Sequence, residues 1–501
     1  MRILLVYPQY PETFWGFQYA LRFISKKASS PPLGLLTVAA MLPKDWEIKL
    51  IDMNVSRLKE RDLLWADYVF ISGMAIQRQS ALKVINLCKK LKVKTVAGGP
   101  LFTSEYDRFP DVDHLVLGEV EELIDELIDD LEHGRARSIY RATRYPEISR
   151  SPIPRWDLVD KDKYAVMCIQ YSRGCPFNCD FCDVTILNGP RPRIKSKDQI
   201  IAELDALYRF GWRDAVFLVD DNFIGNKHKL KKEALPAIAH WMEEHRYPFT
   251  FSTQLSIDLA DDEELMELMI KAGFQTVFVG IETPHEESLI ECSKYQNLKR
   301  DLLESVKKIQ SFGLETQGGF ILGFDHDPPT IFDRMIEFIH ESGIVAAMVG
   351  LLNAPRGSNL YNRLRKEHRL IKSTSGNNTD FTLNFIPKMD WRQLLDGYKR
   401  VLSTIYEPNQ YYRRLKNFIA NFSPPRLRPI YLRFHHFQAF LRSIWHLGII
   451  GEERLHYWKL FTWSLLKKPL IFPLMLSFAI QGYHFRRIFS KYIRNLSSPF
   501  A

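Results

Sequence analysis

The chain has 501 residues, of which 46% are hydrophobic and 25% charged, so it is neither a disordered protein nor one small domain, and two to four domains are expected. Six cysteines in this length are too few for a disulfide-stabilised secreted protein. The net charge of +9 is concentrated in residues 426–501, where twelve Lys or Arg and two acids sum to +10, which leaves about −1 for residues 1–425.

Residues 1–140 alternate short apolar runs with amphipathic stretches, which predicts a doubly wound parallel sheet with helices on both faces. The first run, MRILLVYPQY, lacks the long apolar core and cleavage site of a signal peptide, so we expect a cytoplasmic protein in a reducing compartment. The expected strands are 2–8, 47–54, 68–74, 94–100 and 114–119. The expected helices are 31–43, 79–91 and 120–134.

Residues 141–165 contain several prolines and little periodicity, and we interpret them as a linker. A second alternation follows in residues 166–360, with helical patterns such as 197–210 and 261–272. Six β/α units predict a partial (β/α)6 barrel of TIM type, in which functional groups gather at the carboxyl ends of the strands. The expected strands are 166–172, 215–219, 248–255, 276–281, 315–323 and 345–352.

The C-terminal part is predicted to be mostly helical, with a helical domain in 361–424 and a basic aromatic tail in 425–501. Its most apolar stretch, 469–485, is shorter than the roughly 20 residues that span a bilayer and is interrupted by Pro473 and Gly482. It is either a buried helix or an interfacial helix that meets anionic lipid headgroups. The headgroup contacts would come from Lys467, Lys468, Arg486 and Arg487.

The stretch YSRGCPFNCDFCD places Cys175, Cys179 and Cys182 in a C-x3-C-x2-C arrangement after the first strand of the predicted barrel. Three thiolates can hold three irons of a [4Fe–4S] cube and leave the fourth iron open to the amine and carboxylate of a methionine. A zinc ribbon would need a fourth thiolate or imidazole, which the following VTILNGPRPRIKS does not supply, and a redox pair would leave Cys175 without a role. The other cysteines stand singly in apolar segments, as small core residues do: Cys88, Cys168 and Cys292.

The cysteine motif and several other stretches of the chain resemble those of a known family. RGCPFNCDFC is similar to the signature of the radical S-adenosylmethionine (SAM) superfamily, in which an aromatic residue, here Phe181, precedes the last cysteine. SPPLGLLTVAAML, LIDMN, GGP and GEVEE resemble the cobalamin-binding module of the B12-binding radical SAM class. VDDNFIGNKHKLK, FVGIETP, GGFILGF and NTDFTLNFIPKM resemble a subgroup with an uncharacterised C-terminal domain. The resemblance covers residues 1 to about 420 and implies three cofactors: a [4Fe–4S] cluster, SAM and cobalamin.

The resemblance also implies SAM contacts at the carboxyl ends of the barrel strands. Three polar residues after the second strand can take the methionine amine, or can equally form a turn and helix cap. A glutamine ends the third strand and a glutamate follows the fourth, where polar SAM contacts are expected. Two glycines in the fifth strand permit close backbone approach, or serve packing. The residues are Asp220, Asp221 and Asn222 after the second strand, Gln254 at the end of the third, Glu282 after the fourth, and Gly318 and Gly319 in the fifth.

For cobalamin, the resemblance implies the loops after the strands of the N-terminal sheet, where glycines let a large planar ligand approach the backbone. The chain contains no Asp-x-His pair, so we expect no histidine from that motif on the cobalt. The alternative is an inherited domain that no longer binds the cofactor. The candidate loop residues are Asp52, Asn54, Gly73, Met74, Gln77, Gly98, Gly99, Gly118 and Glu119.

Three functions follow from these features. The first is a cobalamin-dependent methyltransferase, in which one SAM methylates cobalamin and a second SAM supplies a radical that activates an unactivated carbon. The second is a radical SAM enzyme with another outcome, such as cyclisation, rearrangement or oxidation. The third is a non-enzymatic iron–sulfur sensor or nucleic-acid-binding protein, because a basic tail can contact phosphates. The open cluster favours chemistry, and we expect no nucleic acid partner.

The expected partners follow from the methyltransferase hypothesis and the apolar tail. They are a hydrophobic small molecule (a lipid, terpenoid or tetrapyrrole), a reductant of flavodoxin or ferredoxin type, and the cytoplasmic face of a membrane.

Overall fold

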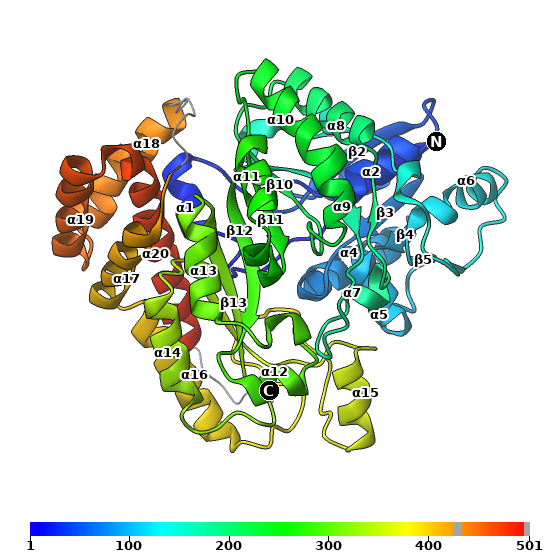
Figure 1. Ribbon diagram of the computed structural model, residues 1–501. Helices are drawn as coiled ribbons and strands as arrows, with labels where there is room; N and C mark the ends of the chain where they lie inside the picture. Colours follow the sequence, from blue (N-terminus) through cyan, green and yellow to red (C-terminus); the bar gives the residue numbers. More distant parts are fainter. Residues whose placement is uncertain (425–432, 495–501) are drawn as a thin grey trace.

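The computed structural model describes residues 1–424 and 433–494, so parts of the predicted tail, including Arg426 and Arg428, lie outside the described residues. The N-terminal part contains a six-stranded parallel sheet in the order β2-β1-β3-β4-β5-β6 (Figure 1), which confirms the doubly wound prediction and adds β6. The strands are β1 (Arg2–Tyr7), β2 (Glu47–Asp52), β3 (Tyr68–Ser72), β4 (Lys94–Gly98), β5 (His114–Leu117) and β6 (Ile139–Arg141).

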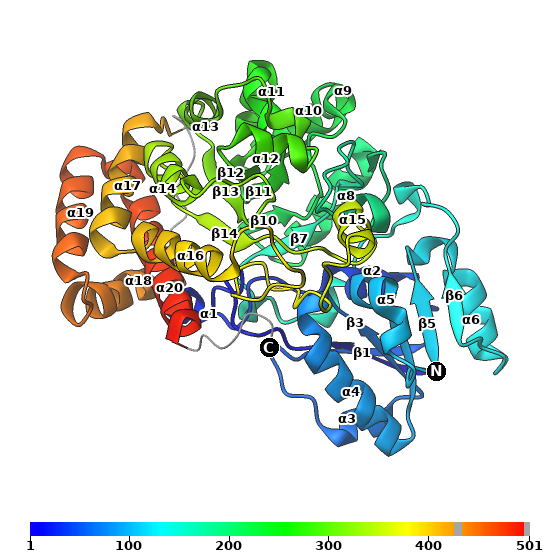
Figure 2. The same cartoon turned by 90° about the horizontal axis from the view of Figure 1, so that it is seen from below.

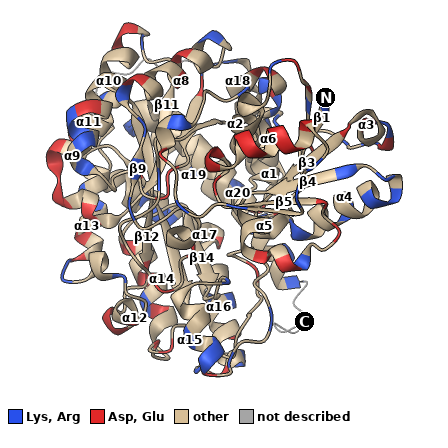
Figure 3. Ribbon diagram, turned by 90° about the vertical axis from the view of Figure 1, so that its right-hand side faces the viewer, with Lys and Arg blue, Asp and Glu red and all other residues tan. Residues whose placement is uncertain are grey.

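The central strands of this sheet are buried on both faces, which explains the continuous apolar runs of β1 and β3. Leu4 and Val6 of β1 point into one core cluster, while Ile3 and Leu5 point into the cluster on the other face, as the two-residue period of a strand requires. Acidic side chains gather on α6 at the outer end of this part (Figure 3). The covering helices are α2 (Leu33–Met41), α3 (Glu60–Trp65), α4 (Arg78–Leu91), α5 (Pro100–Glu105) and α6 (Ile124–Glu132).

The second sheet contains six parallel strands in the order β14-β13-β12-β11-β10-β7, the reverse of the chain order, and it forms the predicted partial barrel. All six predicted strands are present: β7 (Met167–Ile169), β10 (Ala215–Leu218), β11 (Thr250–Leu255), β12 (Phe274–Glu282), β13 (Glu315–Leu322) and β14 (Ala347–Leu351). The helices between them include α8 (Lys197–Arg209), α10 (Leu235–Glu244), α11 (Glu263–Ala272), α12 (Glu286–Glu291), α13 (Leu302–Ser311) and α14 (Ile331–Glu341).

Local sequence signals set the limits of these helices. Ser196 and Gln199 exchange hydrogen bonds in a capping box that begins α8, with the Gln199 amide to Ser196 Oγ at 3.2 Å. Gly273 ends α11 with a φ of +111°, in the left-handed region that favours glycine. The segment 141–165 has no long helix, and it packs closely, because Trp156 and Tyr164 are buried.

Helices dominate the chain after β14, as predicted, and those from residue 408 onward form a layer at the end of the molecule farthest from α6, whereas the helix Asn359–Lys366 lies apart from that layer (Figures 1 and 2). The apolar stretch 469–485 runs from a short 3-10 turn into α20; Leu470 at its start is exposed, but its second half is mostly buried, and the ring of Phe485 stacks on Phe14 with centroids 4.3 Å apart. No helix within the described ranges is long and apolar enough to cross a bilayer. The helices are α15 (Asn359–Lys366), α16 (Trp391–Ile405), α17 (Pro408–Asn421), α18 (Phe434–Ser443), α19 (Arg454–Lys467) and α20 (Phe472–Arg494).

Candidate active site

The three cysteines lie in one loop directly after β7, at the carboxyl end of the barrel strands. The loop runs between β8 (Ser172–Arg173) and β9 (Arg193–Ile194), which pair in antiparallel fashion and close its base. Inside it, the backbone amide of Cys182 donates to the carbonyl of Cys179 at 3.0 Å. One loop therefore presents all three thiols at the edge where a barrel carries its chemistry.

These thiols fit an iron–sulfur cluster better than a single metal ion. Among the described residues, the one group of three His, Cys, Asp or Glu side chains that converges within 4.8 Å contains no cysteine. Burial raises the pKa of all three thiols, that of Cys182 to about 12, so the thiolate form depends on the positive charge of bound iron. Three thiolates leave one iron of a cube without a protein ligand.

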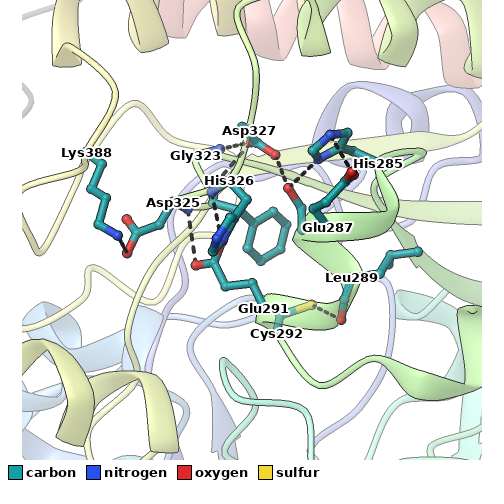
Figure 4. Close-up of polar contacts among 12 residues, drawn as sticks. His285, Glu287, Leu289, Glu291, Cys292, Gly323, Asp325, His326, Asp327 and Lys388 are labelled. Atoms are coloured by element: carbon teal, nitrogen blue, oxygen red, sulfur yellow. Dashed lines mark hydrogen bonds and ion pairs between the residues drawn. The ribbon is translucent and has the colours of Figure 1, made fainter.

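Cys292 is close to the loop in space, but its thiol is used elsewhere. Its Sγ faces the carbonyl of Leu289 at 3.5 Å (Figure 4), and burial raises its pKa. Its own carbonyl accepts a hydrogen bond from the amide of Asp180 at 3.0 Å, which supports the cysteine loop from below. The neighbouring Glu291 ties α12 to the loop after β13 (Figure 4). The remaining cysteines, Cys88 and Cys168, are buried in the core.

The two aspartates after β10 hold the cysteine loop in place. Asp220 is fully buried, and its carboxylate accepts hydrogen bonds from the backbone amide and the hydroxyl of Ser172, the latter at 2.6 Å. Asp221 accepts from the amide of Gly174 and the side-chain amide of Asn188, both at 2.9 Å. Burial raises the pKa of Asp220 to about 7. Asp220 therefore braces the segment before Cys175, and Asp221 joins that segment to Asn188, which follows the three cysteines.

Asn222 and Gln254 lie at the adjacent strand ends. The side chain of Asn222 is buried and donates to Ser256 Oγ at 3.2 Å, which links the end of β10 to the end of β11. Gln254 is half-buried in β11, and its carbonyl accepts from the amide of Phe223 at 2.9 Å. Both residues are thus at the edge that carries the cysteine loop.

The glycines of β13 are packed against aromatic rings. A Cβ atom at Gly318 would lie 2.7 Å from the ring of Phe320, and one at Gly319 would lie 2.7 Å from the ring of Phe278. This crowding supports the packing alternative for both glycines. Phe181 also packs against an aromatic ring, with its ring centroid 6.3 Å from that of Phe324.

Glu282 has a partner that the sequence analysis missed. It ends β12 with a φ of +64°, and its Oε1 lies 2.7 Å from the Nζ of Lys294; both side chains are buried. Burial alone would lower the pKa of Lys294, but Glu282 and Cys179 raise it, so the ammonium group stays charged. Gln296 donates to the Sγ of Cys179 at 3.8 Å. A Cβ at Gly280 would lie 2.4 Å from Glu282 Oε1, so the position of this carboxylate requires a glycine two residues earlier. That glycine was the sign in the sequence that the Glu282 side chain turns inward.

The candidate cobalamin loops are joined at the carboxyl edge of the first sheet. Asp52 accepts from the amide of Asn54 at 2.8 Å and from the hydroxyl of Tyr164 at 3.0 Å. Gln77 is fully buried and donates to the carbonyl of Pro8. The loops after β1, β2 and β3 are therefore held as one surface.

Glycines at this edge are required by the backbone and by close packing. Gly99 and Gly118 have φ values of +88° and +94°, and a Cβ at Gly99 would lie 2.4 Å from Ser72 Oγ. A Cβ at Gly98 would lie 3.0 Å from a carbonyl oxygen of β5, and one at Gly73 would lie 3.3 Å from the Gln77 side chain. Met74 stands out from this edge with 48% of its surface exposed.

Glu119 connects the two parts of the site. It follows β5, and its carboxylate accepts hydrogen bonds from Arg173 of β8 at 2.8 Å and from Arg193 of β9 at 2.9 Å. Arg173 also pairs with Glu121 at 2.7 Å. The loop that carries the cysteines is therefore docked on the loop edge of the first sheet.

A parallel sheet with glycine-containing loops, docked on a partial barrel with three thiols in one loop, defines a radical SAM enzyme with a B12-binding domain. Residues 23–128 match the B12 binding domain, 169–339 the Radical SAM superfamily and 358–498 a domain of unknown function (DUF4070). The chain belongs to the B12-binding radical SAM family, and its cofactors are a [4Fe–4S] cluster, SAM and cobalamin.

Two curated relatives span nearly the whole chain. An uncharacterized methyltransferase of Synechocystis sp. is 39% identical over 490 residues, which cover 97% of this chain and 91% of the relative. A hopanoid C-2 methylase of Rhodopseudomonas palustris is 34% identical over 470 residues, covering 91% and 88%. The solved structure of the radical SAM methyltransferase TsrM from Kitasatospora setae, with cobalamin and a [4Fe–4S] cluster bound, shares the fold with a TM-score of 0.61, 13% identity and coverage of 99% and 100%.

Proposed function

We propose that this cobalamin-dependent radical SAM methyltransferase methylates an unactivated carbon of a polycyclic membrane lipid of the hopanoid type. The observation that carries the proposal is the docking of the cysteine loop on the loop edge of the first sheet through Glu119, which brings the cluster side and the cobalamin side together. The substrate class is supported by the hopanoid C-2 methylase relative, which spans 91% of the chain.

The residues that face the barrel also suit a hydrocarbon substrate. The loop after β1 reaches the barrel strands, where Trp15 packs edge-on against Phe278 of β12 with centroids 5.4 Å apart. Trp15 Nε1 lies 2.9 Å from the sulfur of Met348 on β14. All three side chains are only partly buried, so they offer apolar surface to a bound molecule.

Each bound cofactor supplies a defined part of the chemistry: the cluster supplies an electron that cleaves SAM, and cobalamin carries the methyl group. The chain's own residues position these groups. Asp220 and Asp221 brace the cysteine loop, and Lys294 with Glu282 holds a charge pair beside Cys179. Polar atoms of Asn222, Gln254 and Glu282 are proposed to contact SAM, with the Lys294 ammonium available to its carboxylate.

Cobalamin is proposed to bind over the glycine loops of the first sheet without a histidine on cobalt. His114 is the first residue of β5, so it lies at the opposite edge from the loops, and its Nδ1 bonds to the carbonyl of Arg137 at 2.7 Å. His133 follows the end of α6 and is exposed. Neither histidine of the first 140 residues is therefore near the proposed corrin site.

The protein is also proposed to need an electron donor and a membrane surface, and to have the domain boundaries given below. A reductant of flavodoxin or ferredoxin type would deliver electrons to the cluster, and a membrane surface would hold the substrate. The domain limits are 1–140, a linker in 141–165, the barrel in 166–360, a helical domain in 361–424 and the tail in 425–501.

Product analysis tests this function. Anaerobically reconstituted protein would be incubated with SAM, cobalamin, a chemical reductant and a hopanoid lipid, and the products measured by mass spectrometry. We expect a lipid one methylene heavier, with 5′-deoxyadenosine and S-adenosylhomocysteine formed in equal amounts. 5′-Deoxyadenosine without S-adenosylhomocysteine would identify a non-methylating enzyme, and absence of both would favour a sensor.

A further inference from the structure

The outer helices of the C-terminal layer expose an unusual amount of apolar surface. More than half of the exposed large apolar side chains in the described part of the chain lie between residues 434 and 470. We call the exposed apolar side chains of α18, of the π-helical segment η11 (Ile444–Ile449) and of α19 the outer face. A folded protein rarely leaves a patch of this kind open unless it contacts a partner.

Helix α18 has two different faces. Arg442 donates to the carbonyl of Arg22 and Gln438 accepts from Ser25, at 3.3 Å for the latter, so these residues face the N-terminal segment. His435 lies 3.2 Å from Asp214 and holds the start of the helix to the barrel. The opposite face projects outward at helical spacing and continues into η11 with its last member, with exposures of 75%, 57%, 49% and 56%. These residues are Phe434, Phe437, Leu441 and Trp445.

Helix α19 continues this surface. Its inner side is buried, and Tyr457 bonds to the Ser443 hydroxyl at 2.9 Å, while Trp458 Nε1 donates to the carbonyl of Gly448 at 2.9 Å. These contacts place α19 beside η11. Its outer side exposes Leu455 and Leu466 by 70% and 78%. The apolar stripes of α18 and α19 therefore adjoin.

The charges around the outer face are basic. Arg454, Lys459, Lys467 and Lys468 are exposed, against one exposed acid, Glu452; the other acid of this region, Glu453, is buried and paired with Arg486. At the opposite end of the molecule, α6 carries acidic side chains (Figures 1 and 3). Because of this separation of charge, an anionic surface attracts the side of the molecule that carries α18 and α19. A symmetric contact between two copies would instead bring their lysines together.

We infer that the outer face docks on an anionic lipid bilayer, with the apolar side chains inserted among the headgroups and the lysines on phosphates. This inference rests on the proposed lipid substrate, because an enzyme that lies on the bilayer can take up a molecule held in it. Of the two alternatives drawn from the sequence for 469–485, the structure supports the buried helix, since α20 packs against Phe14; the proposed contact surface is formed by α18, η11 and α19 instead. Tryptophans such as Trp445 suit the headgroup level.

Vesicle co-sedimentation tests the inference with the full-length protein. The probes are vesicles of phosphatidylcholine with 30% phosphatidylglycerol and vesicles of phosphatidylcholine alone, at low and high salt. We expect salt-sensitive binding to the anionic vesicles. The variant Trp445→Ser/Leu455→Ser/Leu466→Ser should bind about tenfold more weakly or worse. Reversal of two charges in Lys467→Glu/Lys468→Glu should weaken binding about tenfold at low salt.

A matched control removes exposed apolar side chains elsewhere: Leu64→Ser/Ile371→Ser/Ile386→Ser should bind like the wild type. Iron content per chain reports folding, and all variants should keep it. Equal binding by the outer-face variant and the control would overturn the inference, as would wild-type protein that stays in the supernatant with both vesicles. Loss of a dimer in the outer-face variant, without vesicle binding, would assign the face to a second copy. Methylation of a detergent-dispersed substrate is measured separately, so failure of docking is distinguishable from failure of the proposed function.

Discussion

Arg173 donates from Nη1 to the carboxylate of Glu119 at 2.8 Å, and this contact joins the strand before the cysteines to the loop after β5. Arg193, on the strand after the cysteines, donates to the same carboxylate at 2.9 Å. The side chains of Glu119, Arg173 and Arg193 are 7%, 15% and 11% exposed. Charges at this depth depend on each other, because water cannot replace a missing partner.

Glu119→Gln should therefore lower the free energy of unfolding by about 3 kcal/mol, since it leaves the buried Arg193 guanidinium without a counter-charge. Urea denaturation of the iron-loaded protein measures the effect. Glu122→Gln is the matched control, because its partner Arg144 has an 80% exposed side chain, and it should cost about 0.5 kcal/mol or less. Equal losses in the two variants would show that Glu119 does not couple the two parts.

Replacement of Cys175, Cys179 or Cys182 by Ala should each abolish the cluster, since two thiolates hold a cube poorly. Iron and sulfide counting after anaerobic reconstitution measures this. Cys292→Ser is the decisive control, because Cys292 is near the loop but its thiol faces Leu289. It should keep the full iron content, as should Cys88→Ser and Cys168→Ser. Four irons retained in Cys179→Ala would refute the assignment.

Lys294→Met and Glu282→Gln should shift the reduction potential of the cluster in opposite directions. Loss of the Lys294 ammonium beside Cys179 removes positive charge, which makes the cluster harder to reduce; loss of the Glu282 carboxylate makes it easier. Each shift should be on the order of 1 kcal/mol, or about 40 mV for one electron. Potentiometric titration followed by EPR measures both. Shifts of the same sign would indicate that these variants disturb the loop rather than the electrostatics.

His484 should make the protein sensitive to acid. It is fully buried in α20, its Nε2 bonds to the carbonyl of Phe14 at 2.9 Å, and burial lowers its pKa to about 4. The unfolded chain takes up a proton near pH 6.5, so the stability contributed by the neutral ring is present above this pH and is lost as the pH falls toward 4. At pH 5 the loss should be about 2 kcal/mol.

Urea midpoints at pH 7 and pH 5 measure this dependence. His484→Gln should reduce the difference between the two pH values, with part of the remainder coming from His340, whose pKa burial also lowers to about 4; His133→Gln, at an exposed position, should leave the difference as in the wild type. An unchanged pH dependence in His484→Gln would assign the acid sensitivity to other groups.

Cobalamin bound to the protein should carry no histidine on cobalt, since both histidines of the first 140 residues lie away from the glycine loops. EPR of the Co(II) form should then lack the nitrogen splitting of an axial imidazole. Observation of that splitting, and its loss in His114→Ala, would place the corrin at the other edge of the sheet.

Periodicity and spacing were sufficient to predict the architecture. The apolar runs of β1 and β3 are continuous because these parallel strands are buried on both faces, whereas β11 alternates half-buried and buried positions; both patterns are visible in one dimension. The strand β6 escaped prediction because its three residues pair at the sheet edge and carry almost no periodic signal. The cysteine loop was also predictable, since all three ligands lie within eight positions of the chain.

The partners of the polar residues were decided by the tertiary structure alone. Asp220, predicted as a SAM contact, reaches Ser172, which is 48 positions away, and Glu119, predicted as a cobalamin contact, reaches Arg193, which is 74 positions away. A carboxylate binds whichever donor the fold brings within reach, and that distance is not encoded in local pattern. Burial works in the same way: α20 and α19 are both apolar and basic in sequence, yet only packing against Phe14 and the barrel determines that α20 is covered while Leu455 and Leu466 of α19 remain exposed.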